Sequence, residues 1–442
     1  MNRFRCGIPM FDDLYLSTIW GGPHFIQFCE NVILFLSSYI KEMPKTDTEK
    51  IELFIDKYFG KSYTMMKQFK LSQMQKTFAN NFHKLIMDAQ LDYFNEKTMN
   101  KNGEHQQCKN FGDIPEVFRQ NIINTLDVHR VYTFNCNHRI FNVTFYADKN
   151  KTYTEKKWEN YIRRIYIWLK IACQFAPKTC ATRLNVHIFM ADIPKKAPTS
   201  QSIPLDRVHA NSAFTSSCVP NTEIVIYRKE EWFKVFIHET FHSLGLDFSR
   251  MDTLDAANRQ IEEIFRLEPS GRDFKLYESY AETWAEIIHI FMVAHFQMLQ
   301  EKTFVHSFIE NLETLLRKEI TFSMIQCTKV LHHNGMNYNQ LMSGEKHKYR
   351  ENTAVFSYYI IKCALLFNMN EFVQWTMMQN HHSIEFKKYL PNVIGYVFFI
   401  AKCSQNQHFI NMMTHIEYQY KLMKSRHPKM FGATTMRMTL IE

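Results

Sequence analysis

The chain has 442 residues with 53 Lys and Arg against 44 Asp and Glu, a net charge of +9, and only 12 Gly and 12 Pro. Its hydrophobic fraction of 45% with 22% charged residues excludes intrinsic disorder for most of its length, because such a chain can bury a large core. The scarcity of glycine and proline also excludes a collagen-like or low-complexity protein. The surplus of Phe, Met, Lys, Asn and Ile is typical of an AT-rich genome, which weakens any functional argument from the net charge.

Three features of the sequence bear on location. Residues 1–16 show neither the apolar segment nor the small-residue cleavage site of a secretory signal. The longest apolar stretches, such as 393–401, are shorter than the about 20 residues that span a bilayer. The ten cysteines, scattered from Cys6 to Cys403 without a CxxC pair, are expected to be reduced and mostly buried thiols. The sequence therefore predicts a cytoplasmic protein without a membrane span.

The first part of the chain, residues 22–126, is predicted to be mostly helical. Apolar residues recur near helical spacing at 25–36 and again at 65–78. A polar loop is expected at 100–107, and a short helix near 117–126 ends this part.

The middle of the chain changes character, because alternating apolar and polar residues indicate strands. The predicted elements are a strand at 139–147, an amphipathic helix at 153–175, strands at 183–190, 213–215 and 223–227, and a helix at 230–244.

From residue 274 onward the pattern is helical again, and 277–298 is the strongest helix there. Further helices are predicted at 305–319, 349–367, 371–378 and 385–402. Residues after 423 are polar and are expected to be frayed.

One motif carries most of the functional information: His238-Glu239-Thr240-Phe241-His242, an HExxH sequence. Histidines at i and i+4 project from one face of a helix, close enough for both imidazoles to bind one Zn²⁺ ion. Glu239 can then take a proton from a water on that metal. The strand at 223–227 before the helix and Gly245 after it, a plausible C-cap, support this interpretation. The alternative is a buried helix whose histidines bond to backbone carbonyls.

A third ligand is required, and Asp247 is the nearest candidate. It lies five residues after His242, whereas families with HExxHxxGxxH or HExxHxxGxxD place the ligand six residues after, where this chain has Phe248. We therefore interpret Asp247 as a turn or capping residue.

The segment YESYAETWAE at 277–286 offers a better third ligand. HExxH followed by a helix of the form ExxA(D/E) resembles the gluzincin metallopeptidases, and ESYAETW resembles the corresponding helix of the anthrax lethal factor group. The resemblance implies that Glu278 is the third zinc ligand and that Glu282 orients His238. Positions 278 and 282 share one helical face, so both carboxylates point the same way. The form repeats one turn later, so a register with Glu282 as ligand and Glu286 as its support stays open.

The resemblance covers residues 138–298 and implies an α+β protein with a zincin-like core at 131–300. This core would hold a small mixed sheet, the HExxH helix and the glutamate helix. The regions 1–130 and 301–442 would form mostly helical N- and C-terminal arms. The phrase VFIHETFHSLGLDFS is also similar to metallopeptidase-like proteins of large nucleocytoplasmic DNA viruses, which implies the host cytoplasm or the virion as location.

Zincins pair an extended substrate with an edge strand. The residues 211–214 (NSAF) are similar to the Asn-Ala strand of thermolysin-like enzymes, which implies that Ala213 and Phe214 bind substrate, with an ordinary loop as the alternative. A donor for the oxyanion is also expected. The candidates, none of which is singled out, are His332, His333, His347, Tyr349, Tyr358 and Tyr359.

The predicted function is a zinc-dependent metalloendopeptidase acting on a protein or peptide substrate. One Zn²⁺ per chain would be held by His238, His242 and Glu278, with Glu239 as general base. The alternative is a non-catalytic structural, virion or scaffold protein that retains the fold, although the intact Glu239 favours an enzyme.

Nucleic acid is not an expected partner. The basic clusters at 346–350 and 156–157 are short and lie near acidic residues, so they are interpreted as solvated faces.

Overall fold

The structure is a computed structural model that describes residues 46–95, 99–100, 103–151, 153–252, 254–268, 274–300, 307–343 and 349–442. The chain separates into two compact units, 1–50 and 51–442, and only residues 46–50 of the first unit are described. The helix predicted at 25–36 lies outside the described residues. The division into regions 1–130, 131–300 and 301–442 stays a prediction.

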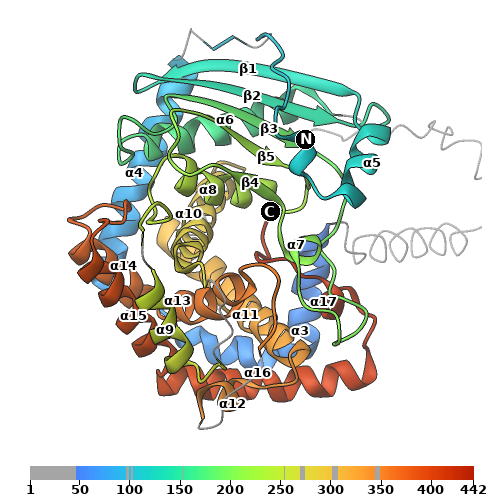
Figure 1. The fold of residues 1–442 in the computed structure, drawn as a ribbon, viewed down its shortest axis with the longest axis vertical. Helices are drawn as coiled ribbons and strands as arrows, with labels where there is room; N and C mark the ends of the chain where they lie inside the picture. The colour runs from blue at the N-terminus through green and yellow to red at the C-terminus, as the bar shows by residue number, and fades with distance from the viewer. Residues whose placement is uncertain are drawn as a thin grey trace, which may run out of the picture. The chain divides into compact units, whose positions relative to one another are not determined.

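A five-stranded mixed sheet lies beside a large group of helices (Figure 1). Its strands are β1 (Val128–Cys136), β2 (Arg139–Ala147), β3 (Arg183–Phe189), β4 (Ala213–Thr215) and β5 (Asn221–Ile226). They are ordered β1-β2-β3-β5-β4. The three inner strands β2, β3 and β5 are parallel, and each edge strand is antiparallel to its neighbour. The fold is thus of mixed α and β type, as predicted.

The two faces of the sheet pack against different parts of the chain. Val186 and Ile188 of β3 and Ile224 of β5 point into the larger core, on the side of α6 (Glu155–Ala172) and α8 (Trp232–Ser243). Side chains of a strand alternate between faces, so the residues between them point the opposite way.

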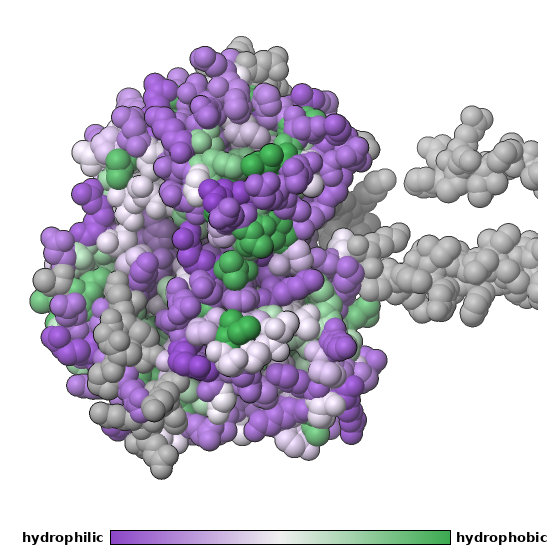
Figure 2. Space-filling model, turned by 45° about the vertical axis from the view of Figure 1, so that its right-hand side comes forward, coloured by the Kyte–Doolittle hydropathy of each residue, from purple (hydrophilic) through white to green (hydrophobic). Residues whose placement is uncertain are grey.

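On the opposite face, Val225 and Tyr227 form a smaller core with Phe118 of α5 (Glu116–Thr125). Phe118 stacks on Tyr227 with ring centroids 5.9 Å apart. Figure 2 brings the right-hand side of Figure 1 toward the viewer and shows groups of hydrophobic side chains among hydrophilic ones. Val117 of α5 is exposed.

The predicted strands and the helix at 153–175 are present, with bounds shifted by at most three residues. The strand β1 was not predicted. It pairs with β2 through a two-residue turn in which Asn137 and His138 both have positive φ, 46° and 64°. This turn geometry favours asparagine, so Asn137 was the available signal for a hairpin.

The remaining elements are helical and include α10, most of whose described side chains are buried. They are α3 (Asp47–Met65), η1 (Met66–Gln68), α4 (Gln73–Asn95), η2 (Phe111–Asp113), α7 (Arg207–Ala210), α9 (Asp255–Ile264), α10 (Leu276–Gln300), α11 (Phe308–His333), α12 (Tyr338–Met342), the π-helical η3 (Phe356–Ile361), α13 (Lys362–Phe367), α14 (Met369–Gln379), α15 (Leu390–Ser404), α16 (Gln407–Arg426) and α17 (Phe431–Thr434). None of the described helices combines the length and the apolar character that a bilayer crossing requires.

The prediction of a frayed segment after residue 423 is wrong. The helix α16 extends to Arg426, and residues 435–441 are buried. The carboxylate of Glu319 on α11 accepts the backbone N–H groups of Leu440 and Ile441 and the hydroxyl of Thr439, at 2.8–3.0 Å. A polar tail can be buried here because a side chain supplies the acceptors that its backbone needs.

The buried Glu319 carboxyl is strongly affected by its surroundings. Burial, and then the nearby Glu286, raise the pKa of Glu319 to about 8. A carboxyl with a raised pKa binds more protons in the folded state than in the unfolded state between pH 4.5 and about 8. The contribution of Glu319 to folding stability must therefore fall as pH rises through this interval.

We predict that Glu319→Gln removes this part of the pH dependence, because an amide keeps an acceptor oxygen but does not titrate. Between pH 5 and 8 the wild type should lose up to about 1.4 kcal/mol of stability per pH unit relative to the variant. Urea unfolding at several pH values measures the difference. The exposed Glu116→Gln is the matched control and should follow the wild type; parallel curves for wild type and Glu319→Gln would contradict the assignment.

Candidate metal centre

The helix α8 is buried along its whole length, because its sequence WFKVFIHETFHS has apolar residues on every side. It ends as predicted at Gly245, which has φ of +68°. The N–H groups of Gly245 and Leu246 bond to the carbonyls of His242 and Phe241, the pattern of a Schellman motif. A Cβ atom at Gly245 would lie 2.8 Å from the Cys180 sulfur, so both conformation and space require glycine here.

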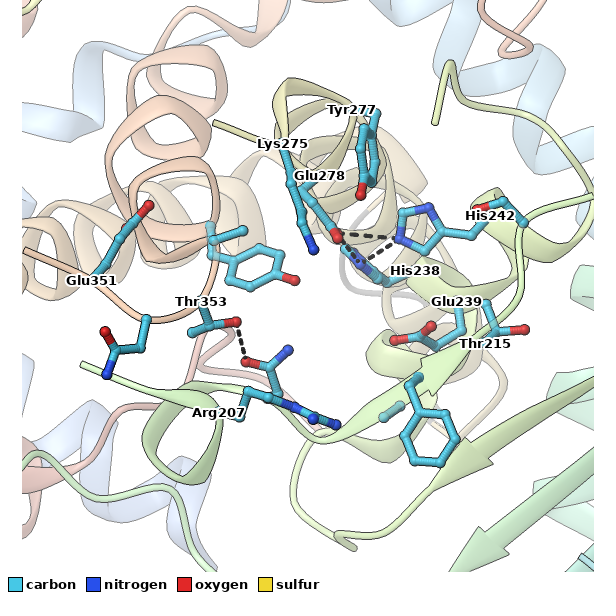
Figure 3. A pocket seen from close by; sticks show the side chains of 17 residues that line it. Arg207, Thr215, His238, Glu239, His242, Lys275, Tyr277, Glu278, Glu351 and Thr353 are labelled. Atoms are coloured by element: carbon cyan, nitrogen blue, oxygen red, sulfur yellow. Dashed lines mark hydrogen bonds and ion pairs between the residues drawn. The ribbon is translucent and has the colours of Figure 1, made fainter. Parts of the chain in front are cut away.

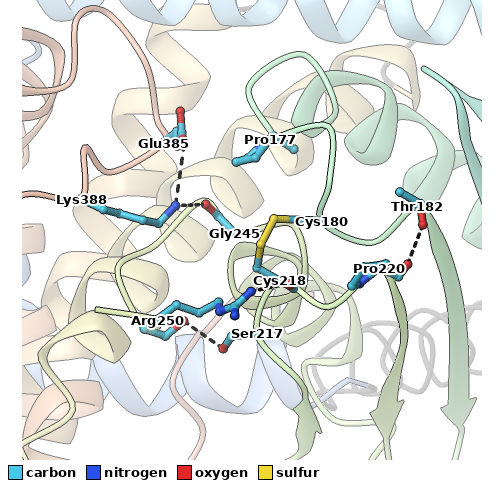
Figure 4. The surroundings of a disulfide bond; sticks show 12 residues. Pro177, Cys180, Thr182, Ser217, Cys218, Pro220, Gly245, Arg250, Glu385 and Lys388 are labelled. Atoms are coloured by element: carbon cyan, nitrogen blue, oxygen red, sulfur yellow. Dashed lines mark hydrogen bonds and ion pairs between the residues drawn. A yellow bond between two sulfur atoms is a disulfide. The ribbon is translucent and has the colours of Figure 1, made fainter. Parts of the chain in front are cut away.

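A disulfide bond between Cys180 and Cys218 lies beside this end of α8 (Figure 4). It corrects the prediction that all cysteines are reduced thiols. Cys180 precedes β3 and Cys218 precedes β5, and the parallel pairing of these strands brings the two residues together. The backbone N–H of Cys218 also donates to the carbonyl of His242 at 3.0 Å, which joins the β4–β5 connection to α8.

Three potential ligand atoms converge between α8 and α10 (Figure 3). The Glu278 Oε2 atom lies 3.0 Å from His238 Nε2 and 3.2 Å from His242 Nε2, and the two Nε2 atoms are 3.1 Å apart. All three side chains are buried. Two imidazole nitrogens and a carboxylate oxygen thus face one point, and together they could hold a metal ion.

Each imidazole also contacts a carboxylate through its other nitrogen. His238 Nδ1 lies 2.9 Å from Glu282 Oε2, and His242 Nδ1 contacts Asp247. The sequence predicted the position of Glu282, but the contact of Asp247 was missed. Asp247 does cap a turn, since its Oδ1 accepts the N–H of Ser249 at 3.1 Å, while its Oδ2 reaches back to His242.

The geometry distinguishes the two registers of the glutamate helix. Among the described carboxylates, Glu278 is the one that approaches the Nε2 atoms of both histidines. Glu282 contacts the outer side of His238, and Glu286, one turn further on, lies 3.6 Å from Lys362. The arrangement is that of the first register, in which Glu282 supports the histidine.

A buried lysine completes the charges behind the site. Lys234, one turn before His238 on α8, contacts Glu282. Burial lowers the pKa of Lys234, but Glu282 and then Glu231 outweigh this effect and raise it above 10.5. Burial opposes ionisation of Glu282 too, yet Lys234 and His238 hold the pKa of its carboxyl well below its usual range. The supporting carboxylate is therefore ionised.

Burial and neighbouring charges also oppose each other in their effects on the pKa values of His238 and Glu278. Burial alone would lower the pKa of His238, but contacts with Glu278 and Glu282 raise it to about 9. Burial would raise the pKa of Glu278, but the two histidines hold it well below 4.5. The site thus stabilises positive charge at the point where the three side chains meet.

A cavity of about 560 Å³ opens onto these residues. The predicted general base, Glu239, lines it beside the histidines, and burial raises the pKa of the Glu239 carboxyl. Ala213 and Phe214, predicted to bind substrate, line the same cavity from the edge strand β4. The structure therefore brings all the predicted site residues except Glu282 to one cavity, and Glu282 lies behind His238.

Of the candidate oxyanion donors that the structure describes, Tyr358 is the one that lines the cavity. Its ring centroid lies 5.9 Å from that of His238, and it belongs to the π-helical segment η3. Local π-helical geometry is frequent at functional sites. His333 bonds to the Ile203 carbonyl, and Tyr359 donates to that of Met436.

The other oxyanion candidates do not line the cavity or are not described. Tyr349 donates to Glu351, and His332 lies 3.3 Å from Lys424 Nζ. His347 lies outside the described residues. Arg207 and Lys275 also line the cavity, and no sequence motif pointed to either of them.

Comparisons of the chain with protein-family models, with curated proteins and with solved structures find no match. The case for a metal site therefore rests on the motif and on the buried His238, His242 and Glu278 cluster, while the identity of the metal is not shown.

We predict that Glu282→Gln weakens metal binding about 10- to 100-fold, because an amide cannot stabilise His238 in the same way and leaves Lys234 without its counter-charge. Competition with a chromophoric chelator measures the affinity. Glu286→Gln, one turn along α10, is the matched control and should change the affinity little. A loss of about 10-fold or more in Glu286→Gln would instead favour the second register, in which Glu286 is the supporting residue.

Proposed function

We propose that this protein is a zinc-dependent metallopeptidase. The observation that carries the proposal is the buried cluster of His238, His242 and Glu278 with Glu239 beside it, all opening onto one cavity next to an edge strand. A cluster that only stabilised the fold would not need an acidic residue facing the same cavity. This combination of groups is suited to hydrolysis.

The donor set fits Zn²⁺, which prefers imidazole nitrogen with a carboxylate and keeps one position open in catalytic sites. His238, His242 and Glu278 would hold it, with Glu282 and Asp247 fixing the orientation of the imidazoles. When bound, zinc supplies a water of lowered pKa and polarises the scissile carbonyl.

The role proposed for Glu239 is proton transfer. It accepts a proton from the attacking water as the water oxygen bonds to the carbonyl carbon. It then gives this proton to the amine nitrogen as the C–N bond breaks. Burial raises the pKa of Glu239, which makes the protonated form accessible and so suits a group that must hold a proton between the two steps.

The substrate proposed is an extended peptide segment. β4 lies at the edge of the sheet and pairs with β5 on its inner side. Its residues Ala213 and Phe214 line the cavity, so a peptide that adds a strand to this edge would run past the metal ligands. Tyr358 faces the same cavity and is the proposed donor to the developing oxyanion.

The first test is Glu239→Gln, which should lower peptide hydrolysis by about 10²- to 10⁴-fold and leave the bound metal unchanged. A mixture of denatured proteins serves as the substrate, and hydrolysis is measured by the number of new α-amino groups. The metal content of each variant is measured by emission spectrometry. Glu263→Gln on the exposed side of α9 is the control. Wild-type hydrolysis in Glu239→Gln would refute the mechanism, and a metal-loaded wild type without hydrolysis would favour the non-catalytic scaffold.

The second test is Tyr358→Phe, which removes the hydroxyl but keeps the ring packing against His238. We expect kcat to fall by about 10²-fold with little change in KM or metal content, because the hydroxyl acts in the transition state. Tyr359→Phe is the matched neighbour, since its hydroxyl donates to the Met436 carbonyl instead. An unchanged kcat in Tyr358→Phe would exclude this tyrosine as the donor.

A further inference from the structure

A second group of ligand atoms lies on the opposite face of the sheet from α8. The sulfur of Cys108, a ring nitrogen of His187 and a carboxylate oxygen of Glu223 lie within 4.8 Å of one another. His187 is on β3 and Glu223 on the neighbouring strand β5. Cys108 is a free cysteine in the loop before η2, so three separate segments contribute.

The register of the sheet shows that this group is separate from the first site. Asn185 is paired with Glu223 in the β3–β5 ladder, and His187 lies two residues further along β3, so both side chains point to the same face. This is the face of Val225 and the smaller core, whereas Ile188 and Ile224 point toward α8. The sheet itself lies between the two groups.

One ring nitrogen of His187 contacts a tyrosine hydroxyl, and the other ring nitrogen has no hydrogen-bond partner among the described residues. Its Nδ1 lies 3.1 Å from the hydroxyl of Tyr146, which also approaches His105 Nε2 at 3.1 Å. Its Nε2 is fully buried and has no hydrogen-bond partner among the described residues. The nearest carboxylate atom, Glu223 Oε1, is 3.8 Å away, beyond hydrogen-bond distance. A buried nitrogen without a partner is costly unless something occupies the space that it faces.

The carboxylate of Glu223 is fixed in place by the segment that carries Cys108. Its Oε2 accepts the backbone N–H groups of Lys109 and Asn110, at 3.2 and 3.3 Å, and the side-chain amide of Asn110 at 3.2 Å. The Lys109 N–H also lies 3.4 Å from Oε1, the oxygen that faces His187 Nε2. These bonds hold the oxygen atoms of Glu223 next to the cysteine. A cavity of about 350 Å³ lined by Glu223 and Asn110 adjoins the group and can admit water.

We propose that Cys108, His187 and Glu223 form a second metal site, which binds a zinc-type divalent ion and fastens the 103–113 segment to the sheet. Tetrahedral zinc separates its donor atoms by about 3.3–3.8 Å, so the three atoms need only small movements to bind. Thiolate with imidazole selects zinc over magnesium or calcium. Binding forms a metal–sulfur bond and releases the thiol proton to solvent, and water from the adjoining cavity takes the fourth position.

An ion at this site would connect the sheet to a segment that contacts the cavity of the first site. The 103–113 segment ends at Asp113, whose carbonyl accepts a hydrogen bond from Arg207 at 3.3 Å. Arg207 lines the cavity of the first site. An ion at the second site would thus hold one wall of that cavity without touching its metal ligands.

Cobalt binding to the full chain tests the proposal, because only a sulfur ligand gives a thiolate-to-cobalt charge-transfer band in the near ultraviolet. Protein stripped with chelator and titrated with Co²⁺ should develop this band, which the first site cannot produce since it has no sulfur. We expect two equivalents of metal in the wild type and one in Cys108→Ser, with the band lost in that variant. His187→Gln should also lose the band.

Two controls separate this site from the first. His242→Ala should lose one equivalent of metal but keep the band. Cys327→Ser, which replaces a different free cysteine that is buried, should keep the band and both equivalents of metal. Absence of the band in the wild type, or its persistence in Cys108→Ser, overturns the second site. If the wild type binds one ion that His242→Ala removes, the second site is refuted while the proposed peptidase function is unaffected.

Discussion

The position of His238 between two buried carboxylates is the constraint on which the candidate site depends. Glu282 contacts the outer ring nitrogen, so the inner nitrogen is the one that faces Glu278 and His242. A ligand histidine is useful only in this orientation, because its tautomer and ring plane decide where the lone pair points. The opposite histidine is held in the same way by Asp247. Two elements far apart in sequence, α8 and α10, are therefore fixed relative to each other through their charges.

Buried charges are unfavourable unless each one contacts an opposite charge. Behind the site, buried acidic and basic side chains alternate, so each charge has an opposite neighbour. Glu282 contacts Lys234. At the start of α8, Glu231 accepts a hydrogen bond from the ammonium group of Lys195, at 2.7 Å. Glu231 also accepts the backbone N–H of Met438, and Lys362 donates to the carbonyl of the same residue. The tail after α17 thus takes part in the network that orients His238, although it lies far from any ligand in sequence.

The predictable parts of this structure are those set by local pattern. The HExxH motif, the glycine that ends α8 and the apolar spacing of α10 placed both helices, and the strands from 139 to 227 followed from alternation. The features that were missed depend on how the chain folds back on itself and on partners distant in sequence. The contact of Asp247 requires the chain reversal at Gly245, burial of the tail requires Glu319 on α11, and the disulfide requires the pairing of β3 with β5. Single-sequence periodicity carries no information about these distances.

The edge strand β4 is tied down on both sides. Before β4, the Asn211 side chain accepts a hydrogen bond from the hydroxyl of Thr353, and the Ser212 carbonyl accepts one from the backbone N–H of Tyr227. After β4, the chain reaches Cys218, which is held by the disulfide. A rigid strand has little conformational entropy to lose when another chain pairs with it, so most of that cost falls on the incoming peptide. For the proposed substrate, this favours segments that are already extended and accessible, such as exposed loops and termini, over segments that must first unfold from a helix.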